Sequence, residues 1–411
     1  MNKPALLTPV LIGGSIILLV SFAIRASFGV FQLPIAEEFG WPRADFSMAI
    51  AIQNLAWGIG QPIFGAIAER FGDRRAIILG ALLYAAGLVL SSLAVTPSQH
   101  QLLEVIVGFG IAGTGFGVIL AIVGRAATPE NRSLALGIAT AVGSAGQVIG
   151  APVAEILLGI YSWQVVFVIF AAAILLSLLA LPLIRAPVAA ARQEVQESMG
   201  AVLTRAIRDP SYVLIFVGFF SCGYQLGFIT AHFPAFVTEV CGAINPNGAL
   251  AQLGIATTSA LGAVAISLIG LANIAGSILS GWLGKRFTKK YLLAGVYTAR
   301  TVVSILFIMF PMTPATVILF SLVMGLLWLA TVPLTSGLVA YIYGVRYMGT
   351  LYGFVFFSHQ VGAFLGVWLG GKMYDATGNY DLVWWIGIGV GAFSAIVHLP
   401  IRERPLMAQP A

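Results

Sequence analysis

The sequence predicts an all-α membrane protein in which twelve transmembrane helices form two pseudo-symmetric six-helix bundles. Of its 411 residues, 59% are hydrophobic and only 9% are Asp, Glu, Lys or Arg, whereas soluble proteins carry about 25% charged residues. Such a chain cannot cover a water-exposed surface with charge, which excludes a soluble enzyme, a secreted disulfide scaffold and a disordered chain. Twelve apolar runs and an internal repeat complete the argument.

The apolar runs account for the predicted helices one by one. A helix needs about 20 residues to cross the hydrocarbon core of a bilayer, and each run is about that long or longer. The first run follows Lys3 and contains Arg25. It is too long for the apolar core of a signal peptide, so we read it as the first span. Bounded by Gly, Pro and charged residues, the spans are predicted at 9–35, 44–68, 76–95, 101–124, 133–157, 164–184, 211–237, 253–283, 291–310, 314–341, 348–371 and 383–401.

The basic residues are distributed unevenly between the two sides of the predicted membrane. Seventeen of the 21 Lys and Arg fall on the side of the termini, and only Arg43 and Lys372 fall on the other side. Cytoplasmic loops are enriched in Lys and Arg. We therefore expect a multi-pass protein of the cell (inner) membrane with both termini in the cytoplasm.

The longest polar stretch between spans, residues 185–210, divides the spans six against six. We predict an N-terminal bundle over 1–185, a cytoplasmic linker over 186–210 and a C-terminal bundle over 211–411. A shift of 216 residues superimposes features of the two halves. Repeats of this kind are typical of secondary transporters, which bind substrate between the repeats near the bilayer midplane. The matched pairs are Gly65 with Gly281, Arg70 with Arg286, Phe71 with Phe287, Gly137 with Gly353, Gly146 with Gly362 and Gly150 with Gly366.

The loop between spans two and three, GAIAERFGDRR (65–75), resembles the signature loop of the major facilitator superfamily. Glu69 stands where Asp is usual and Asp73 where a base is usual, and the copy at 281–291 carries Lys285 at the acid position. The resemblance implies the major facilitator fold. It also implies a gating role for Glu69, Arg70, Asp73 and Arg74, which would hold the halves together on the cytoplasmic side. The alternative is that the basic residues only set the topology.

Two further segments, residues 25–52 and 125–139, resemble the monocarboxylate and oxalate–formate branch of this superfamily. In that branch the first span often carries a base before a Val-Phe step, as Arg25 precedes Val30 and Phe31 here. Span eight departs from the branch, because residues 272–282 lack its acid and its arginine. Span four lacks the arginine of proton-coupled exporters, since Phe109 occupies that position.

Ionisable residues inside spans are costly and usually functional. The predicted spans contain Arg25, Arg300 and His359, whereas Glu104 and Glu155 are assigned to outer ends, so that no acid is expected at mid-depth. Bases without acids favour an anion by Coulomb attraction. We expect Arg25 to bind a substrate carboxylate through its planar fork, and His359 to carry the coupled proton or to donate to the anion. Arg25 could instead bond backbone carbonyls, and His359 could be a neutral interhelical histidine.

The remaining polar residues of the spans are supporting candidates for the substrate site. Each has a structural alternative. Amide side chains also join helices by hydrogen bonds. Arg300 could instead brace the fold, and Trp328 could be a packing residue. The supporting candidates are Gln53, Asn54, Gln147, Tyr224, Gln225, Asn273, Arg300 and Trp328.

The sequence carries no phosphate-binding GxxxxGK[ST] loop and no metal-ligand cluster. It also lacks a buried Ser–His–Asp set, and Cys222 and Cys241 are read as ordinary thiols. No cofactor, metal, enzymatic activity or nucleic-acid partner is therefore expected.

We expect a monomeric secondary transporter that moves a small organic anion, most simply a carboxylate, across the lipid bilayer by alternating access. It would use a proton or a counter-anion for coupling. One alternative is an efflux pump for hydrophobic drugs, which the missing mid-membrane acid disfavours. Another is a membrane sensor or lipid-handling protein, which the absence of an appended soluble domain disfavours.

Overall fold

The computed structural model describes residues 6–41, 43–184 and 197–406, and within these residues the regular structure is helical. The first half holds α1 (Pro9–Ser27), η1 (Phe28–Phe31), α2 (Gln32–Phe39), α3 (Arg43–Phe71), α4 (Asp73–Ser91), α5 (Pro97–Thr114), α6 (Phe116–Ala126), α7 (Arg132–Leu158), α8 (Trp163–Leu176) and η2 (Ser177–Leu183). The rest holds α9 (Met199–Arg208), α10 (Pro210–Val240), α11 (Ala249–Gln252), α12 (Thr258–Arg286), α13 (Lys289–Met309), α14 (Pro314–Leu327), α15 (Thr331–Tyr343), α16 (Met348–Thr377) and α17 (Asp381–His398).

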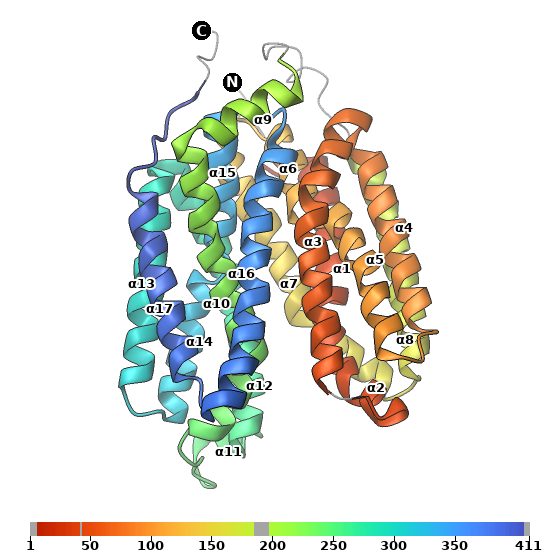
Figure 1. Ribbon diagram of the computed structural model, residues 1–411, viewed down its shortest axis with the longest axis vertical. Coiled ribbons are helices and arrows are strands. Elements are labelled where there is room, and N and C mark those ends of the chain that lie inside the picture. The colour runs from red at the N-terminus through yellow and green to blue at the C-terminus, as the bar shows by residue number, and fades with distance from the viewer. Residues whose placement is uncertain (1–5, 42, 185–196, 407–411) are drawn as a thin grey trace.

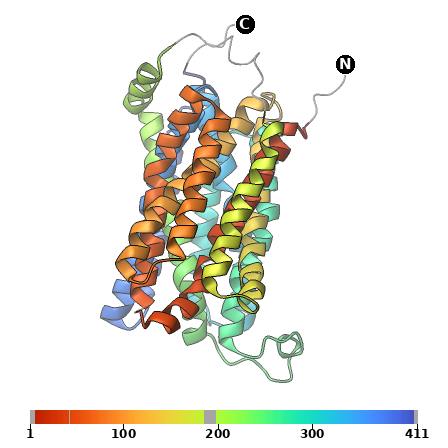
Figure 2. The ribbon, with the colours of Figure 1, turned by 90° about the vertical axis from the view of Figure 1, so that its right-hand side faces the viewer.

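The long helices stand side by side along the long axis of the molecule (Figures 1 and 2). Figure 1 shows α10 to α17 on one side and α1, α3, α4, α5 and α8 on the other. The start of α1 and the end of α17 lie at the same end, which we call the termini end, and α9 crosses there. The short helices α2 and α11 lie at the opposite end, which we call the far end.

The predicted spans agree with the observed helices to within a few residues at most boundaries. Eleven segments of the described chain are long and apolar enough to cross a membrane. Helix α3, the predicted second span, is not among them, although it has 29 residues. Three amide side chains, Gln53, Asn54 and Gln61, lower the hydropathy of α3.

The division of the chain into two bundles joined by a linker stays a prediction. The bounds of the helices do not test it. Residues 186–196 of the predicted linker lie outside the described residues. The part from Met199 to Arg208 forms the helix α9, which was not predicted. Ser198 begins it by accepting a hydrogen bond from the Ala201 amide at 3.3 Å, as a helix N-cap does.

Several spans begin with proline after a polar cap. Pro97 and Pro314 open α5 and α14, and the side chains of Thr96 and Thr313 cap these helices. Proline is favoured there because the first helical amide has no intrahelical acceptor to lose. These signals position the helix starts near the far end in both halves.

Two spans are broken at related positions. Span four divides into α5 and α6 at Gly115, and span ten divides into α14 and α15 at residues 328–330. The 216-residue shift places Gly115 on residue 331. A break frees backbone carbonyls that other groups must satisfy inside a membrane, and discontinuous helices mark the sites of many transporters.

The two halves meet through two helix pairs, α7 with α12 and α3 with α16. A Cβ on Gly137 would meet the Ser277 carbonyl at 2.7 Å and Gly281 at 2.9 Å. In the other pair, a Cβ on Gly353 would meet Pro62 at 2.6 Å. Gly137 and Gly353 are one of the repeat pairs, so the same small-residue approach occurs twice. Both contacts lie toward the termini end of their helices, and Figure 1 shows α16 and α3 diverging toward the far end.

Candidate substrate-binding site between the two halves

Arg25 lies in the last turn of α1 and is partly buried. Its Nη2 donates a hydrogen bond of 2.7 Å to Asn54 Oδ1 on α3, and its guanidinium lies 4.8 Å from the centre of the Trp57 ring. Its Nε is buried without a hydrogen-bond partner in the described part of the chain. None of the ion pairs among those residues includes Arg25. The positive charge is therefore held in place by neutral groups.

The Asn54 turn also contacts the other half. Gln360 of α16 donates from Nε2 to the Asn54 backbone carbonyl at 3.1 Å. The neighbouring His359 has its Nδ1 2.9 Å from Gln360 Oε1, and its ring stacks on Phe356 with centroids 5.1 Å apart. Arg25 and His359 thus lie on opposite halves and are joined through the side chain and backbone carbonyl of Asn54 and the side chain of Gln360.

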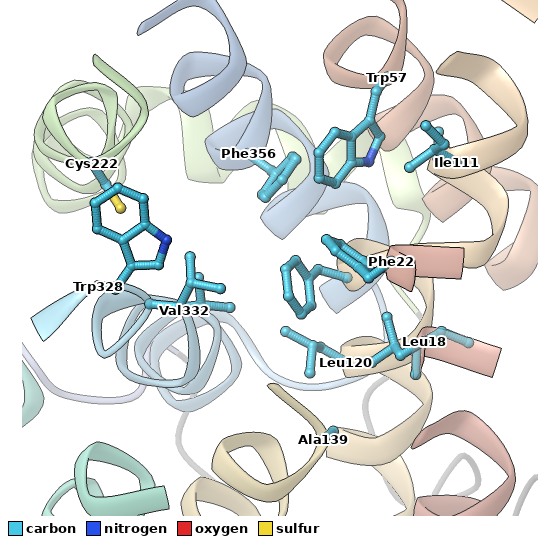
Figure 3. Close-up of a cluster of buried hydrophobic side chains, with 14 of the residues drawn as sticks. Leu18, Phe22, Trp57, Ile111, Leu120, Ala139, Cys222, Trp328, Val332 and Phe356 are labelled. Carbon is cyan, nitrogen blue, oxygen red and sulfur yellow. The ribbon is translucent and has the colours of Figure 1, made fainter. Parts of the chain in front are cut away.

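Aromatic and aliphatic side chains of both halves surround this polar connection. The rings of Trp57 and Phe356 lie 4.8 Å apart across the halves, and Phe22 packs against Trp57 at 5.7 Å. Figure 3 shows buried apolar side chains from both halves gathered in one cluster. Those labelled in it include Phe22, Trp57, Leu120, Trp328, Val332 and Phe356. Trp328, a predicted site residue, therefore belongs to an apolar wall built by both halves.

Asn273 of α12 makes the matching polar contact between α12 and α7. Its Nδ2 donates to Ser144 Oγ at 2.9 Å, and its Oδ1 accepts from the Leu329 amide at 2.9 Å. The 216-residue shift places Ser144 on Gln360, so the two inter-half contacts are pseudo-symmetric. Gln147, one turn further along α7, is half-buried beside this contact.

Arg300 lies elsewhere and is fully buried. Its Nε and Nη2 donate to the Leu327 carbonyl at 3.1 and 2.8 Å, and Nη2 also bonds the Trp328 carbonyl. Its Nη1 lies 3.4 Å from Gln225 Oε1. The arginine satisfies carbonyls freed by the break in span ten, so the geometry supports a bracing role and we leave Arg300 out of the proposed site.

Tyr224 and Gln225 of α10 face α17 rather than the other half. The Tyr224 hydroxyl donates to the Val383 carbonyl at 3.4 Å, and Gln225 Nε2 donates to the Gly387 carbonyl at 3.1 Å. Gln53 of α3 likewise turns to α5, where its Nε2 donates to Glu104 Oε2 at 2.6 Å. These three predicted residues contact neighbours of their own half.

The predicted gating residues lie at the termini end, and their partners differ. The Glu69 carboxylate accepts from the amide of Thr350 at 3.1 Å and from its hydroxyl, so it crosses to the start of α16. Asp73 pairs with Arg125, and Arg74 Nε donates to the Ile184 carbonyl at 2.8 Å, both within the first half. Arg70 is exposed and stacks on Phe71, with 5.3 Å to the ring centre.

Sequence reasoning missed a buried acid. Glu104 was assigned to the outer end of its span, yet it is 0% exposed and packs against Gln53 and His100. The expectation placed this acid by its depth along the span and did not anticipate that neighbouring helices bury it. The available signal was the spacing of His100 and Glu104, four residues apart on one helix, which places both on one face. Their burial depends on α3 and could not be read from α5 alone.

A separate hollow of about 650 Å³ lies beside α9 at the termini end. It lies outside the membrane-spanning helices that carry the predicted site residues. Its lining is formed by Gly200, Ala201, Thr204, Arg205, Arg208, Asp209 and Leu406.

Comparison with known proteins identifies the family. Residues 14–356 and 242–411 match the family model described as Major Facilitator Superfamily. The chain is similar to the uncharacterized MFS-type transporter YcxA of Bacillus subtilis, at 26% identity over 92% of this chain and 90% of that protein. It is also similar to monocarboxylate transporter 13 of Bos taurus, at 28% identity over 87% of this chain and 80% of that protein.

A further relative is named for another activity. The multidrug resistance protein MdtH of Photorhabdus laumondii is 30% identical over 95% of this chain and 93% of its own length. Among solved structures, the transporter FucP in the outward conformation matches with a TM-score of 0.72. That match covers 96% of this chain and 98% of FucP at 17% identity, and it shows the fold alone.

Proposed function

This chain belongs to the major facilitator superfamily, and we propose that it is the carrier of a small organic anion, most simply a carboxylate, anchored by Arg25. It is a multi-pass membrane protein and a secondary transporter, not an enzyme. We further propose that it lies in the inner membrane with the termini end in the cytoplasm. The uneven distribution of Lys and Arg supports that orientation.

The observation that carries the proposal is the charge balance at Arg25. Its guanidinium is held by Asn54 and Trp57, and among the described residues no ion pair neutralises it. A buried cation held by neutral groups attracts an anion strongly because the surroundings screen little. A carboxylate can accept two parallel N–H bonds from the planar guanidinium, which makes arginine the side chain best suited to it.

The connection to His359 supports a site that both halves share. An anion bound to Arg25 would lie near the contact of Asn54 with Gln360, next to His359. Alternating access requires the halves to move around such a site. We propose that His359 donates to the anion from the second half, and that the rings of Trp57 and Phe356 exclude water around the organic part of the substrate.

A second candidate function is efflux of hydrophobic compounds. Two observations favour it: the aromatic walls shown in Figure 3, and the 30% identity to a protein named for multidrug resistance. The buried Glu104 also removes one reason for disfavouring it. Arg25 argues against a cationic substrate, because a bound cation would be repelled by the uncompensated guanidinium.

Thermal stability of the purified protein with candidate ligands tests the proposal. Pyruvate, oxalate and benzoate are compared with the lipophilic cation tetraphenylphosphonium. A ligand at 100 times its dissociation constant stabilises the protein by about 2.7 kcal/mol. We expect at least one carboxylate to stabilise the wild type and the control Arg75→Gln, which alters an exposed arginine at the start of α4, but not Arg25→Gln. Stabilisation by tetraphenylphosphonium alone would favour the efflux function.

A further inference from the structure

A buried acid–base pair lies inside the first half, away from the contact between the halves. Glu104 Oε1 lies 3.7 Å from His100 Nε2, and the two residues are 0% and 1% exposed. Glu104 Oε2 accepts one hydrogen bond, of 2.6 Å, from Gln53 Nε2. Glu104 Oε1 and both ring nitrogens of His100 have no hydrogen-bond partner among the described residues. The pair therefore has unused donor and acceptor capacity in a fully buried site.

An isolated ionised carboxylate is too costly in such surroundings to persist with one amide as its partner. In the closed arrangement described here, the site needs one proton, placed either on Glu104 or on His100, where it would form an ion pair. Among the described residues that contact the pair, none is another cation. His100 is covered by the rings of Trp41, Phe46 and Phe167, at 6.0, 5.6 and 6.5 Å.

The neighbouring helices contribute few charged or titratable groups. Helix α3 supplies the neutral Gln53, and its Asp45, near the far end, meets α5 through its backbone carbonyl, which accepts from Gln101 at 3.2 Å. Helix α4 supplies Tyr84, whose hydroxyl donates to the Ser21 carbonyl at 3.3 Å. Tyr84 lies within electrostatic reach of both Glu104 and Arg25.

Glu104 and Arg25 are both hydrogen-bonded by the same turn of α3. Gln53 bonds Glu104, and the next residue, Asn54, bonds Arg25. Both charged groups also lie at a similar depth. Glu104 comes seven residues after the start of α5, and Arg25 six residues before the end of η1, so each is about 10 Å from the far end of its span at 1.5 Å per residue. A change of charge at Glu104 therefore acts on Arg25 through one helical turn and through space.

We propose that Glu104, paired with His100, is the binding site of a proton that is co-transported with the anion. This rests on the proposed anion site at Arg25. With Glu104 ionised, its negative charge repels a substrate carboxylate from the region of Arg25. When a proton from water forms an O–H bond on Glu104, that repulsion ends, so proton and anion favour each other's binding. One proton and one carboxylate charge then cross together, and the proton returns to water on the other side.

Transport in proteoliposomes tests the coupling. Wild type, Glu104→Gln, Glu104→Asp and His359→Gln are compared, with Glu155→Gln as the control because Glu155 is an exposed acid on α7. The probe is the carboxylate that stabilises the purified protein. Uptake driven by an inward proton gradient is measured beside exchange of internal for external substrate, which moves no net proton. We expect Glu104→Gln to keep exchange and to lose accumulation by tenfold or more, with Glu155→Gln unchanged.

Other outcomes separate the two proposals. Gradient-driven accumulation by Glu104→Gln at the wild-type level would overturn the proton site, as would its loss in His359→Gln alone. If no carboxylate is transported or exchanged by the wild type, the proposed anion function fails. The proton site is then tested separately, by measuring the infrared absorption band of a protonated carboxyl group. That band should be present in the wild type, titrate with pH and disappear in Glu104→Gln.

If Glu104→Gln does not fold, Glu104→Asp decides the question. Its shorter side chain loses contact with Gln53 but keeps the titratable group, so the pH dependence of accumulation should shift while exchange persists. An unchanged pH profile in Glu104→Asp would count against the site.

Discussion

Glu69 of α3 caps the first turn of α16 through Thr350, and this contact joins the two halves at the termini end. Thr350 is the third residue of α16, where backbone amides have no intrahelical acceptor. A carboxylate there gains both charge-assisted hydrogen bonds and the favourable field of the helix N-terminus. The acid of the signature loop thus binds a helix end of the other half.

Glu69→Gln should weaken this closure. The neutral amide keeps one acceptor but loses the charge, which is worth about 1–2 kcal/mol for such hydrogen bonds. We expect the halves to separate more often at the termini end. Spin labels at the exposed positions Arg75 and Arg286, after replacement of both cysteines, report the distance. Asp73→Asn, which breaks a pair within one half, is the control, and an equal effect of both variants would contradict the assignment.

Gly137→Leu should prevent the closed arrangement altogether. Its Cβ alone would meet the Ser277 carbonyl at 2.7 Å, so a larger side chain must push α7 from α12. The same spin-label distance should lengthen and transport should fall at least tenfold. Gly295→Leu is the matched control, because nothing lies within 4 Å of a Cβ at that position. A normal distance in Gly137→Leu would show that the helices can pass without this close approach.

Asn54→Ala should reduce anion affinity without unfolding the protein. The variant removes the acceptor that orients Arg25, a hydrogen bond to a charged group worth about 1.5–3 kcal/mol, so the dissociation constant should rise about tenfold or more. The ligand-induced thermal shift measures it. Asn247→Ala, at an exposed position near α11, should behave as the wild type. If affinity stays the same in Asn54→Ala, Arg25 does not need this partner.

Arg300→Gln should destabilise the fold by about 3 kcal/mol, because buried carbonyls at the span-ten break lose charged donors. The melting temperature of the purified protein without ligand reports this loss. Arg286→Gln, which alters an exposed arginine stacked on Trp282, is the control. If Arg300→Gln melts as the wild type does but no longer responds to a carboxylate, Arg300 contacts substrate after all.

The sequence by itself determined where the membrane-spanning segments lie. Hydrophobic runs, prolines after polar caps and charged loops act locally, so the spans, the family and the presence of Arg25 inside the first span could all be predicted. The 216-residue shift also pairs Gly137 with Gly353, and both glycines lie in close helix contacts, because small residues at a helix interface leave a pattern in the sequence.

The tertiary structure alone decided what each buried polar group contacts. Arg25 and Arg300 look alike in sequence, since each is a lone arginine in an apolar run. One lies beside the contact between the halves, whereas the other satisfies carbonyls freed by a break in the next span. The sequence placed Glu104 at the outer end of its span, and only the structure shows that α3 packs over it. Such partners lie dozens of residues away, and no local pattern encodes which helix faces will meet.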